Sequence, residues 1–210
     1  MVQRNAGFIV PQIKKNCNQK QKIFPLPTQT IPSTKGRNPT LSTVESFIYK
    51  GLKGIFMKKI EKIASFTVDH DLLTEGIYVS RIDGDITTYD LRTRVPNAGD
   101  YMDNLTMHSV EHMFATYVRA SEIADRVIYF GPMGCQTGFY LLVRNADNAE
   151  TLEVVKSVLQ RIVDHDGEMF GAVKKECGNY LNLDLAAAKR ECERYLAILN
   201  GKENDFIYKS

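Results

Sequence analysis

Two histidines and a glutamate fall within five residues, at His108, Glu111 and His112 in the stretch HSVEH. Residues three and four apart lie on the same side of a helix, so these three side chains would share one face of a single turn. Two neutral imidazoles at this spacing can hold one metal ion, and a carboxylate beside them can move protons. The chain has only four histidines, and two of them are here. We therefore interpret the stretch as a metal site rather than a solvated polar face.

This spacing alone does not decide the reaction, because His-x-x-Glu-His also occurs in inverzincin-type metallopeptidases. In such a peptidase the third ligand would be a downstream glutamate, and Glu168 or Glu176 could take that place. A thiolate is also available from Cys177, in the stretch KKECGNYLNL. Two histidines and one cysteine would leave a fourth position open on the metal, as a catalytic site requires.

A second cysteine, Cys135, lies in the glycine-rich stretch GPMGCQTG. Glycines in a tight turn let the backbone approach a ligand closely. A cysteine that is exposed on such a turn near a cation loses its proton more readily than an ordinary thiol. Cys135 is thus a candidate reactive thiol, although a small residue filling a turn explains it equally well from the turn alone.

Strands are predicted on both sides of these motifs. The stretches Gly76–Ile82 and Ile86–Val95 are rich in β-branched and aromatic residues and flank the sequence DGD, which predicts a hairpin. Two further strands are predicted over residues 126–130 and 139–145, joined by the glycine-rich turn.

Three helices complete the pattern. The first is predicted over Leu105–Ala124 with Asp103 or Asn104 as its cap, and the others over about 148–164 and 183–199. Because the strands fall in adjacent pairs, with no regular alternation of strand and helix, we expect an α+β fold. Its antiparallel sheet would have the helices packed on one face.

Two residues receive structural roles only. Cys192 shares a face of the third helix with apolar residues and is predicted to lie in the core. His165 follows the second helix among acids, in DHDGE, and is predicted to be a solvated helix end.

Composition narrows the class of protein. A net charge of +2 argues against a nucleic-acid binder, and no apolar run approaches the length of a membrane span. The four cysteines are too few and too scattered for a disulfide scaffold. We expect a reducing compartment, the cytoplasm.

The first quarter of the chain differs from the rest. Residues 1–56 hold nine Lys or Arg and one acid, and five of the seven prolines. We expect this segment to be a disordered basic extension, with the natural domain over residues 57–210. It could be a transit peptide, a nucleic-acid arm, or upstream sequence translated from a start set too early. We favour the last, because Met57 opens a sensible natural start.

Taken together, the motifs resemble the S-ribosylhomocysteine lyase (LuxS) family from about Met57 to about Gly201. The resemblance is carried, in order, by SFTVDH, YDLR followed by VPN, HSVEH, PMGCQTGFY and CGNY. Each stretch is weak by itself, and five in the same order are specific. One departure is Tyr129, in YFGPMGC, where family members often have an acid in DISPMGC.

The resemblance implies a LuxS-like fold and a set of site residues. These are the metal ligands His108, His112 and Cys177, the acid–base pair Glu111 and Cys135, and the substrate-pocket residues Ser65, His70 and Arg92. It implies one divalent metal per subunit, Fe²⁺ in the cell with Zn²⁺ or Co²⁺ as alternatives, and a homodimer with active sites at the subunit interface.

The activity implied is cleavage of the thioether of S-ribosylhomocysteine. The products would be homocysteine and 4,5-dihydroxy-2,3-pentanedione, the precursor of the quorum-sensing signal autoinducer-2. This chemistry requires two proton carriers, and it gives Cys135 a task that the peptidase alternative does not.

Overall fold

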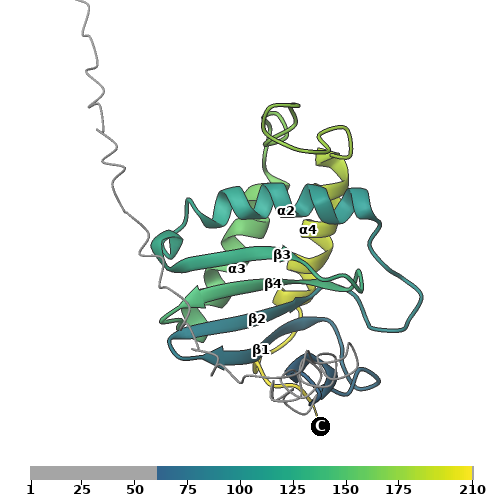
Figure 1. The fold of residues 1–210 in the computed structure, drawn as a ribbon. Coiled ribbons are helices and arrows are strands. Elements are labelled where there is room, and N and C mark those ends of the chain that lie inside the picture. The colour runs from purple at the N-terminus through teal and green to yellow at the C-terminus, as the bar shows by residue number, and fades with distance from the viewer. Residues whose placement is uncertain (1–60, 210) are drawn as a thin grey trace, which may run out of the picture. The chain divides into compact units, whose positions relative to one another are not determined.

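A four-stranded antiparallel sheet in the order β1-β2-β4-β3 is the centre of the fold. The computed structural model describes residues 61–209; the predicted disorder of residues 1–56 and the domain start at Met57 lie outside these residues. The strands are β1 (Gly76–Asp83), β2 (Ile86–Arg92), β3 (Val127–Pro132) and β4 (Gly138–Arg144). Figure 1 shows them side by side, with the helices α3 and α4 behind the sheet.

The hairpin predicted at DGD is confirmed, and the two strands predicted on either side of the glycine-rich turn also pair with each other. Asp83 pairs with Ile86 across a two-residue turn, and Gly84 takes the positive φ of 63° that this turn needs. β2 ends at Arg92 rather than at the predicted Val95. The reason is that the backbone N–H groups of the next two residues, Thr93 and Arg94, donate to Thr137 O instead of continuing the ladder.

The α-helices are α2 (Asn104–Val118), α3 (Asn148–Val163) and α4 (Leu185–Asn200), and short 3-10 turns lie at η1 (Ala64–Phe66) and η2 (Ala124–Arg126). Each α-helix begins behind an aspartate, Asp103, Asp147 or Asp184, whose side chain accepts hydrogen bonds from backbone N–H groups of the first turn.

The predicted continuation of the first helix to Ala124 is wrong. The backbone N–H groups of Ala120 and Ser121 donate to Tyr117 O and Val118 O, three residues back instead of four, and the Ser121 hydroxyl also donates to Val118 O at 2.7 Å, so the α-helical pattern stops here.

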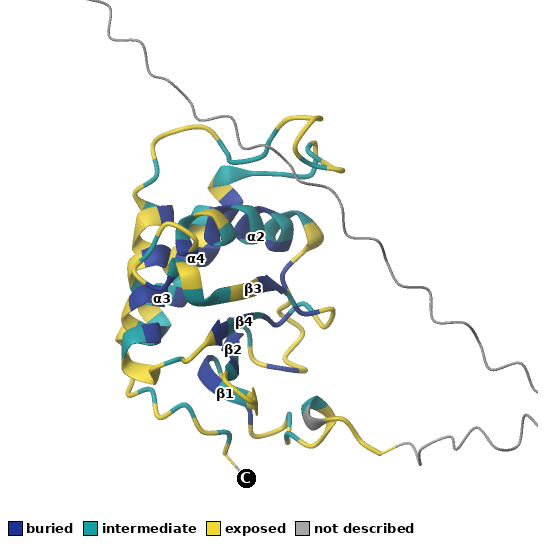
Figure 2. Ribbon diagram, turned by 60° about the vertical axis from the view of Figure 1, so that its left-hand side comes forward, coloured by how far each residue is buried: buried dark blue, intermediate teal, exposed yellow. Residues whose placement is uncertain are grey.

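The two faces of the sheet differ in what covers them. On one face, alternate residues of the strands pack against the three α-helices and form the core, as the burial colours of Figure 2 show. Buried members of this core include Tyr89, Leu91, Phe139, Leu141, Phe114, Val155 and Cys192. On the other face, Ser80, Thr88 and Tyr140 line hollows instead. The expected α+β fold, with helices on one face of an antiparallel sheet, is therefore confirmed.

Among residues 61–209, no helix combines the length and the apolar character needed to cross a membrane.

Candidate active site

The two histidines of the HSVEH motif lie on α2 with their rings close together. The ring centroids of His108 and His112 are 4.7 Å apart. Each Nδ1 is hydrogen-bonded to a backbone carbonyl, His108 to Asn182 O at 2.8 Å and His112 to Phe170 O at 2.9 Å. Because a carbonyl only accepts, each Nδ1 carries the proton of the neutral ring. The lone pair of each Nε2 is then the one that can bind a metal. This is the tautomer in which a histidine binds a metal through Nε2.

Cys177 completes the group. Its Sγ lies 3.4 Å from His108 Nε2, and the candidate ligand atoms of His108, His112 and Cys177 all lie within 4.8 Å of one another. Tetrahedral coordination with the usual Zn–S and Zn–N bond lengths would separate sulfur and nitrogen by about 3.5 Å. The three donors therefore fit one divalent metal ion.

The surroundings of His112 are built closely around its ring. Gly171 has a φ of 68°, and a Cβ atom there would lie 2.6 Å from His112 Nδ1. Only a glycine gives the chain room at this point. Glu111 lines the same hollow of about 540 Å³ as the three candidate ligands and is half-buried beside them.

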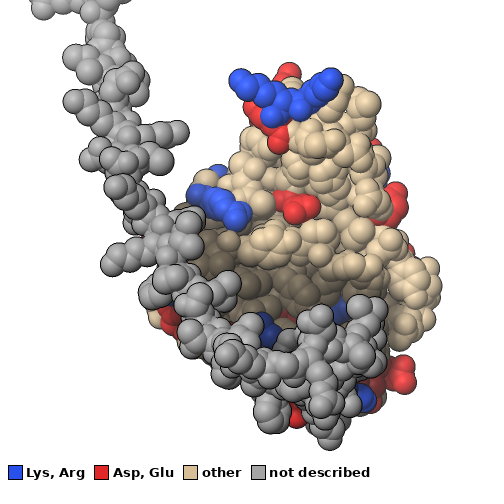
Figure 3. All heavy atoms as spheres, in the orientation of Figure 1, with Lys and Arg blue, Asp and Glu red and all other residues tan. Residues whose placement is uncertain are grey.

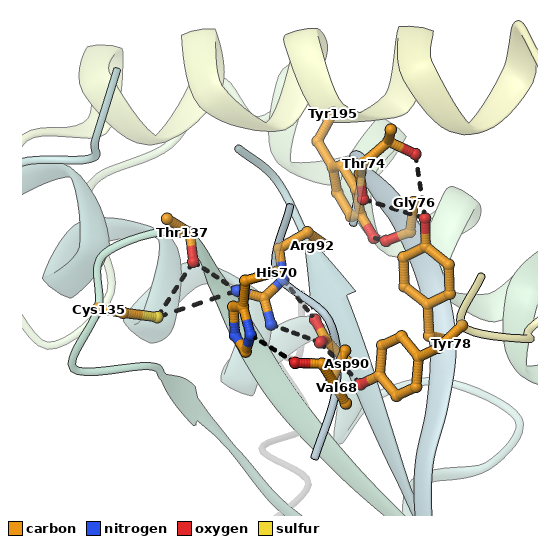
Figure 4. A network of polar contacts seen from close by, with 11 residues as sticks. Val68, His70, Thr74, Gly76, Tyr78, Asp90, Arg92, Cys135, Thr137 and Tyr195 are labelled. Carbon is orange, nitrogen blue, oxygen red and sulfur yellow. Dashed lines mark hydrogen bonds and ion pairs between the residues drawn. The ribbon is translucent and has the colours of Figure 1, made fainter. Parts of the chain in front are cut away.

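A second hollow, of about 300 Å³, brings the other four predicted residues together. Ser65, His70, Arg92 and Cys135 all line it, although they come from three separate segments of the chain. Figure 4 shows Cys135 pointing toward the Arg92 guanidinium, with His70 on the near side of it. The Cys135 side chain is exposed, as a reactive thiol must be.

Electrostatics at this thiol are set by Arg92. Its Nη1 lies 3.9 Å from Cys135 Sγ and donates to the Thr137 hydroxyl at 2.5 Å. Burial by itself would lower the pKa of Arg92, but the charge of Asp90 and two hydrogen bonds to it, at 3.1 and 2.5 Å, outweigh burial and raise that pKa. The guanidinium therefore places a positive charge next to the sulfur of Cys135.

Asp90 is held in this site from both sides. Burial raises its pKa, and the paired Arg92 opposes that rise. The Tyr208 hydroxyl also donates to Asp90 Oδ2, at 2.9 Å. Three hydrogen bonds to its two oxygens therefore hold the carboxyl group in place beside Arg92.

A family model described as S-Ribosylhomocysteinase (LuxS) matches residues 63–205. The chain belongs to the LuxS family. Its relatives include the S-ribosylhomocysteine lyase of Borreliella afzelii, 42% identical over 156 residues that cover 71% of this chain and 99% of the relative. The lyase of Finegoldia magna is 41% identical over 155 residues, with the same two coverages. That of Phocaeicola vulgatus is 41% identical over 156 residues, 71% of this chain and 97% of the relative. The peptidase alternative is not favoured.

The predicted site residues of this LuxS chain thus form two groups. His108, Glu111, His112 and Cys177 line one hollow, and Ser65, His70, Arg92 and Cys135 line the other. The two linings share no residue among those described.

Tyr129, which stands where LuxS proteins often have an acid, lies beside the second group. It lines a neighbouring hollow of about 330 Å³ that shares Ser65, Ser80 and Tyr140 with the Cys135 hollow. The residue is 48% exposed, and its hydroxyl lies against Gly131, where an added Cβ atom would clash with it.

Sequence reasoning missed several residues of the LuxS site. Asp90 was detectable, since it lies two residues before Arg92 on a strand and so faces the same side. Thr137 was detectable in the same way, since it lies two residues after Cys135. Its hydroxyl is hydrogen-bonded to the Cys135 sulfur at 3.1 Å. Tyr208 could not be found from the sequence, because it lies near the C-terminus, far from the motifs. Burial and the charge of Asp90 raise the pKa of its hydroxyl.

The two structural predictions have different outcomes. Cys192 is 1% exposed, so its place in the core is confirmed, and burial raises the pKa of its thiol well above the usual range. The solvated helix end predicted for His165 is wrong. Both ring nitrogens are engaged, Nδ1 with the Tyr117 hydroxyl at 2.7 Å and Nε2 with Glu168 O at 2.8 Å.

Proposed function

We propose that this LuxS-family chain is an S-ribosylhomocysteine lyase that forms homocysteine and 4,5-dihydroxy-2,3-pentanedione. Relatives with that name match this chain over nearly their whole length. The observation that carries the proposal is the approach of Cys177 Sγ to His108 Nε2, at 3.4 Å. A cysteine in the third position fits the lyase, whereas the peptidase reading required a glutamate there.

The reaction needs proton transfer at several carbons of the sugar. A thioether leaves carbon 5 by β-elimination only if carbon 4 is acidic, which requires a carbonyl at carbon 3. Since the sugar begins with its carbonyl at carbon 1, the carbonyl migrates twice before elimination. Each migration takes a proton from one carbon and returns one to its neighbour, so two positioned proton carriers are required.

The residues of the two hollows suit these tasks. Cys135, as a thiolate beside Arg92, takes a proton from carbon, and Glu111 carries protons on the side of the metal group. A divalent metal held by His108, His112 and Cys177 would supply Lewis-acid stabilisation of negative charge on sugar oxygens. Ser65 and His70 line the hollow around the thiol and would orient the sugar.

We propose a homodimer, and the separation of these groups within one chain supports it. Within one chain, the metal ligands and Cys135 line hollows with no described residue in common, yet the reaction needs them on one substrate. A second copy of the chain would bring the metal group of one subunit to the Cys135 hollow of the other. Above the grey atoms, the open side of the sheet carries few charged side chains in Figure 3, as a subunit interface requires.

We further propose Fe²⁺ as the metal in the cell, with Zn²⁺ or Co²⁺ able to replace it, since two imidazoles and a thiolate suit all three ions. A cytoplasmic location agrees with three free cysteines among the described residues. The domain proper would begin at Met57, six residues before the match to the family begins.

The test separates the two cysteines. Cys177→Ala should lose metal and homocysteine release together, because it removes one of three ligands. Cys135→Ala should keep the metal and fold normally, with turnover lower by about 10²–10⁴-fold, because it removes only a proton carrier. Glu111→Gln should behave like Cys135→Ala, and Glu176→Gln, in the same hollow, is the control expected to keep both metal and turnover.

The measurements are metal content by elemental analysis and the rate of thiol release from S-ribosylhomocysteine. Loss of metal from Cys135→Ala with retention in Cys177→Ala would reverse the two roles. Retention in both, together with cleavage of peptides, would refute the lyase.

A further inference from the structure

Tyr117 and His165 form a contact that no step of the proposed reaction uses. Tyr117 is on α2, five residues after His112, and His165 lies just beyond the end of α3. The Tyr117 hydroxyl and His165 Nδ1 are 2.7 Å apart, and His165 Nε2 is 2.8 Å from Glu168 O. Because that carbonyl only accepts, Nε2 carries the proton, and the Nδ1 of a neutral ring accepts from the Tyr117 hydroxyl.

Through this hydrogen bond the His165 ring holds the segment 165–171 against α2, the helix that bears His108 and His112. Further contacts hold the same segment. The Phe170 ring centroid lies 4.9 Å from that of His165 and 5.4 Å from that of Tyr117. Lys189 Nζ, on α4, donates to His165 O at 2.8 Å. Figure 1 shows the chain beyond α3 passing over α2 before it returns to α4.

This segment carries the atom that orients His112. Phe170 O accepts the hydrogen bond from His112 Nδ1, and that bond selects the tautomer whose Nε2 can bind metal. The next residue, Gly171, packs directly against the imidazole ring, since a Cβ atom there would lie 2.6 Å from His112 Nδ1. A shift of the segment would therefore displace the carbonyl and the imidazole together.

The second histidine ligand is supported elsewhere. His108 Nδ1 bonds to Asn182 O, and the Asn182 side chain donates to Asn104 Oδ1 at 2.5 Å. Tyr117 and His165 take no part in these contacts. A disturbance at the Tyr117–His165 pair should thus reach the metal through His112 alone.

We propose that Tyr117 and His165 are positioning residues for the metal ligand His112, acting through the carbonyl of Phe170. The proposal rests on the metal centre proposed above and adds a function for a hydroxyl and an imidazole outside it. Without the Tyr117 hydroxyl, the 165–171 segment keeps its chain path but samples more positions. His112 then spends less time in the orientation that holds a metal.

The expected size follows from the distance to the ligand. Removing the direct hydrogen-bond partner of a ligating histidine typically lowers metal affinity about 10–100-fold. The Tyr117–His165 pair lies one contact further out, so the loss of metal affinity should be at or below the lower end of that range, about three- to tenfold.

The experiment loads the full chain with Co²⁺ and follows the absorption of the bound ion after addition of excess chelator. Tyr117→Phe should release the ion about three- to tenfold faster than the unchanged protein and shift its absorption bands. Tyr101→Phe removes a hydroxyl from a half-exposed tyrosine outside this contact and should change neither quantity. The melting temperature of each metal-free variant shows whether the fold is retained.

Three further variants keep the test independent of folding defects. His165→Ala should release Co²⁺ as fast as Tyr117→Phe, and the double variant should be no faster, because the two side chains act as one unit. His165→Asn places an oxygen near the position of Nδ1, which can accept from Tyr117, and should recover part of the retention.

The outcomes distinguish this proposal from the one before it. If the protein without substitutions takes up no Co²⁺, the proposed metal centre is refuted, and this inference with it. Normal uptake, with equal release rates for Tyr117→Phe and Tyr101→Phe, would overturn the role of Tyr117 and His165 alone. So would fully additive effects in the double variant.

Discussion

Glu191 on α4 is a buried carboxylic acid in an environment that disfavours its charge. Only 5% of the residue is exposed. Arg94 Nη2 donates to Oε2 at 2.5 Å, but Oε1 is buried with no hydrogen-bond partner among the described residues. Burial raises the pKa of Glu191 from the ordinary value of 4.5 to about 7, against the opposing charge of Arg94. The substitution Glu191→Gln removes the titration and keeps the shape.

The sign and size of the effect on stability follow by linkage. Between pH 4.5 and about 7 the folded protein holds the Glu191 proton and the unfolded chain has lost it. Stability contributed by this group is therefore complete below pH 4.5, falls as the pH rises, and is lost above about 7. The difference between the two pKa values corresponds to on the order of 3 kcal/mol.

The assay is urea unfolding of the metal-free protein at pH 5, 6, 7 and 8. The free energy of unfolding of Glu191→Gln, minus that of the unchanged protein, should rise by up to about 3 kcal/mol from the lowest pH to the highest. Glu193→Gln, an exposed acid on the same helix, is the matched control and should run parallel to the unchanged protein. A flat difference would refute the raised pKa. A difference that falls with pH would mean that the Arg94 ion pair outweighs burial.

Two other outcomes are expected. Gly171→Ala should speed metal release at least about tenfold and lower stability by about 1–2 kcal/mol, because the new Cβ meets His112 at a φ of 68°. Gly178→Ala, with nothing within 4 Å, is its control in the same chelator and melting assays, and equal behaviour of the two would contradict the reasoning. Deletion of residues 1–56, to begin at Met57, should leave solubility and homocysteine release unchanged. Loss of either would show that the extension has a part in the protein.

The local parts of the site were predictable because short-range geometry determines them. The spacing of His108, Glu111 and His112 needs only helical periodicity to bring the three side chains into one hollow. The caps Asp103 and Asp147 bond to backbone groups three residues away, within reach of sequence rules. The hairpins followed from alternating strands around a turn for the same reason.

The supports of the site were not predictable, because they join segments distant in sequence. The carbonyls of Phe170 and Asn182 meet the two histidines across 58 and 74 residues. A backbone carbonyl carries no residue type, so no pattern could mark either one. His165 was misjudged for a related reason: its acidic neighbours suggested solvent, while its partner Tyr117 lies 48 residues earlier in the chain.

Residue types alone could not choose among the candidates for the third metal ligand. Cys177, Glu176 and Glu168 all offered donor atoms of a suitable kind, and two of them are adjacent in sequence. A turn in which the N–H of Cys177 donates to Val173 O directs the thiol to His108, and the Asn179 N–H donates to its sulfur at 3.3 Å. The main-chain carbonyl of Glu168 instead accepts from His165 Nε2, at 2.8 Å.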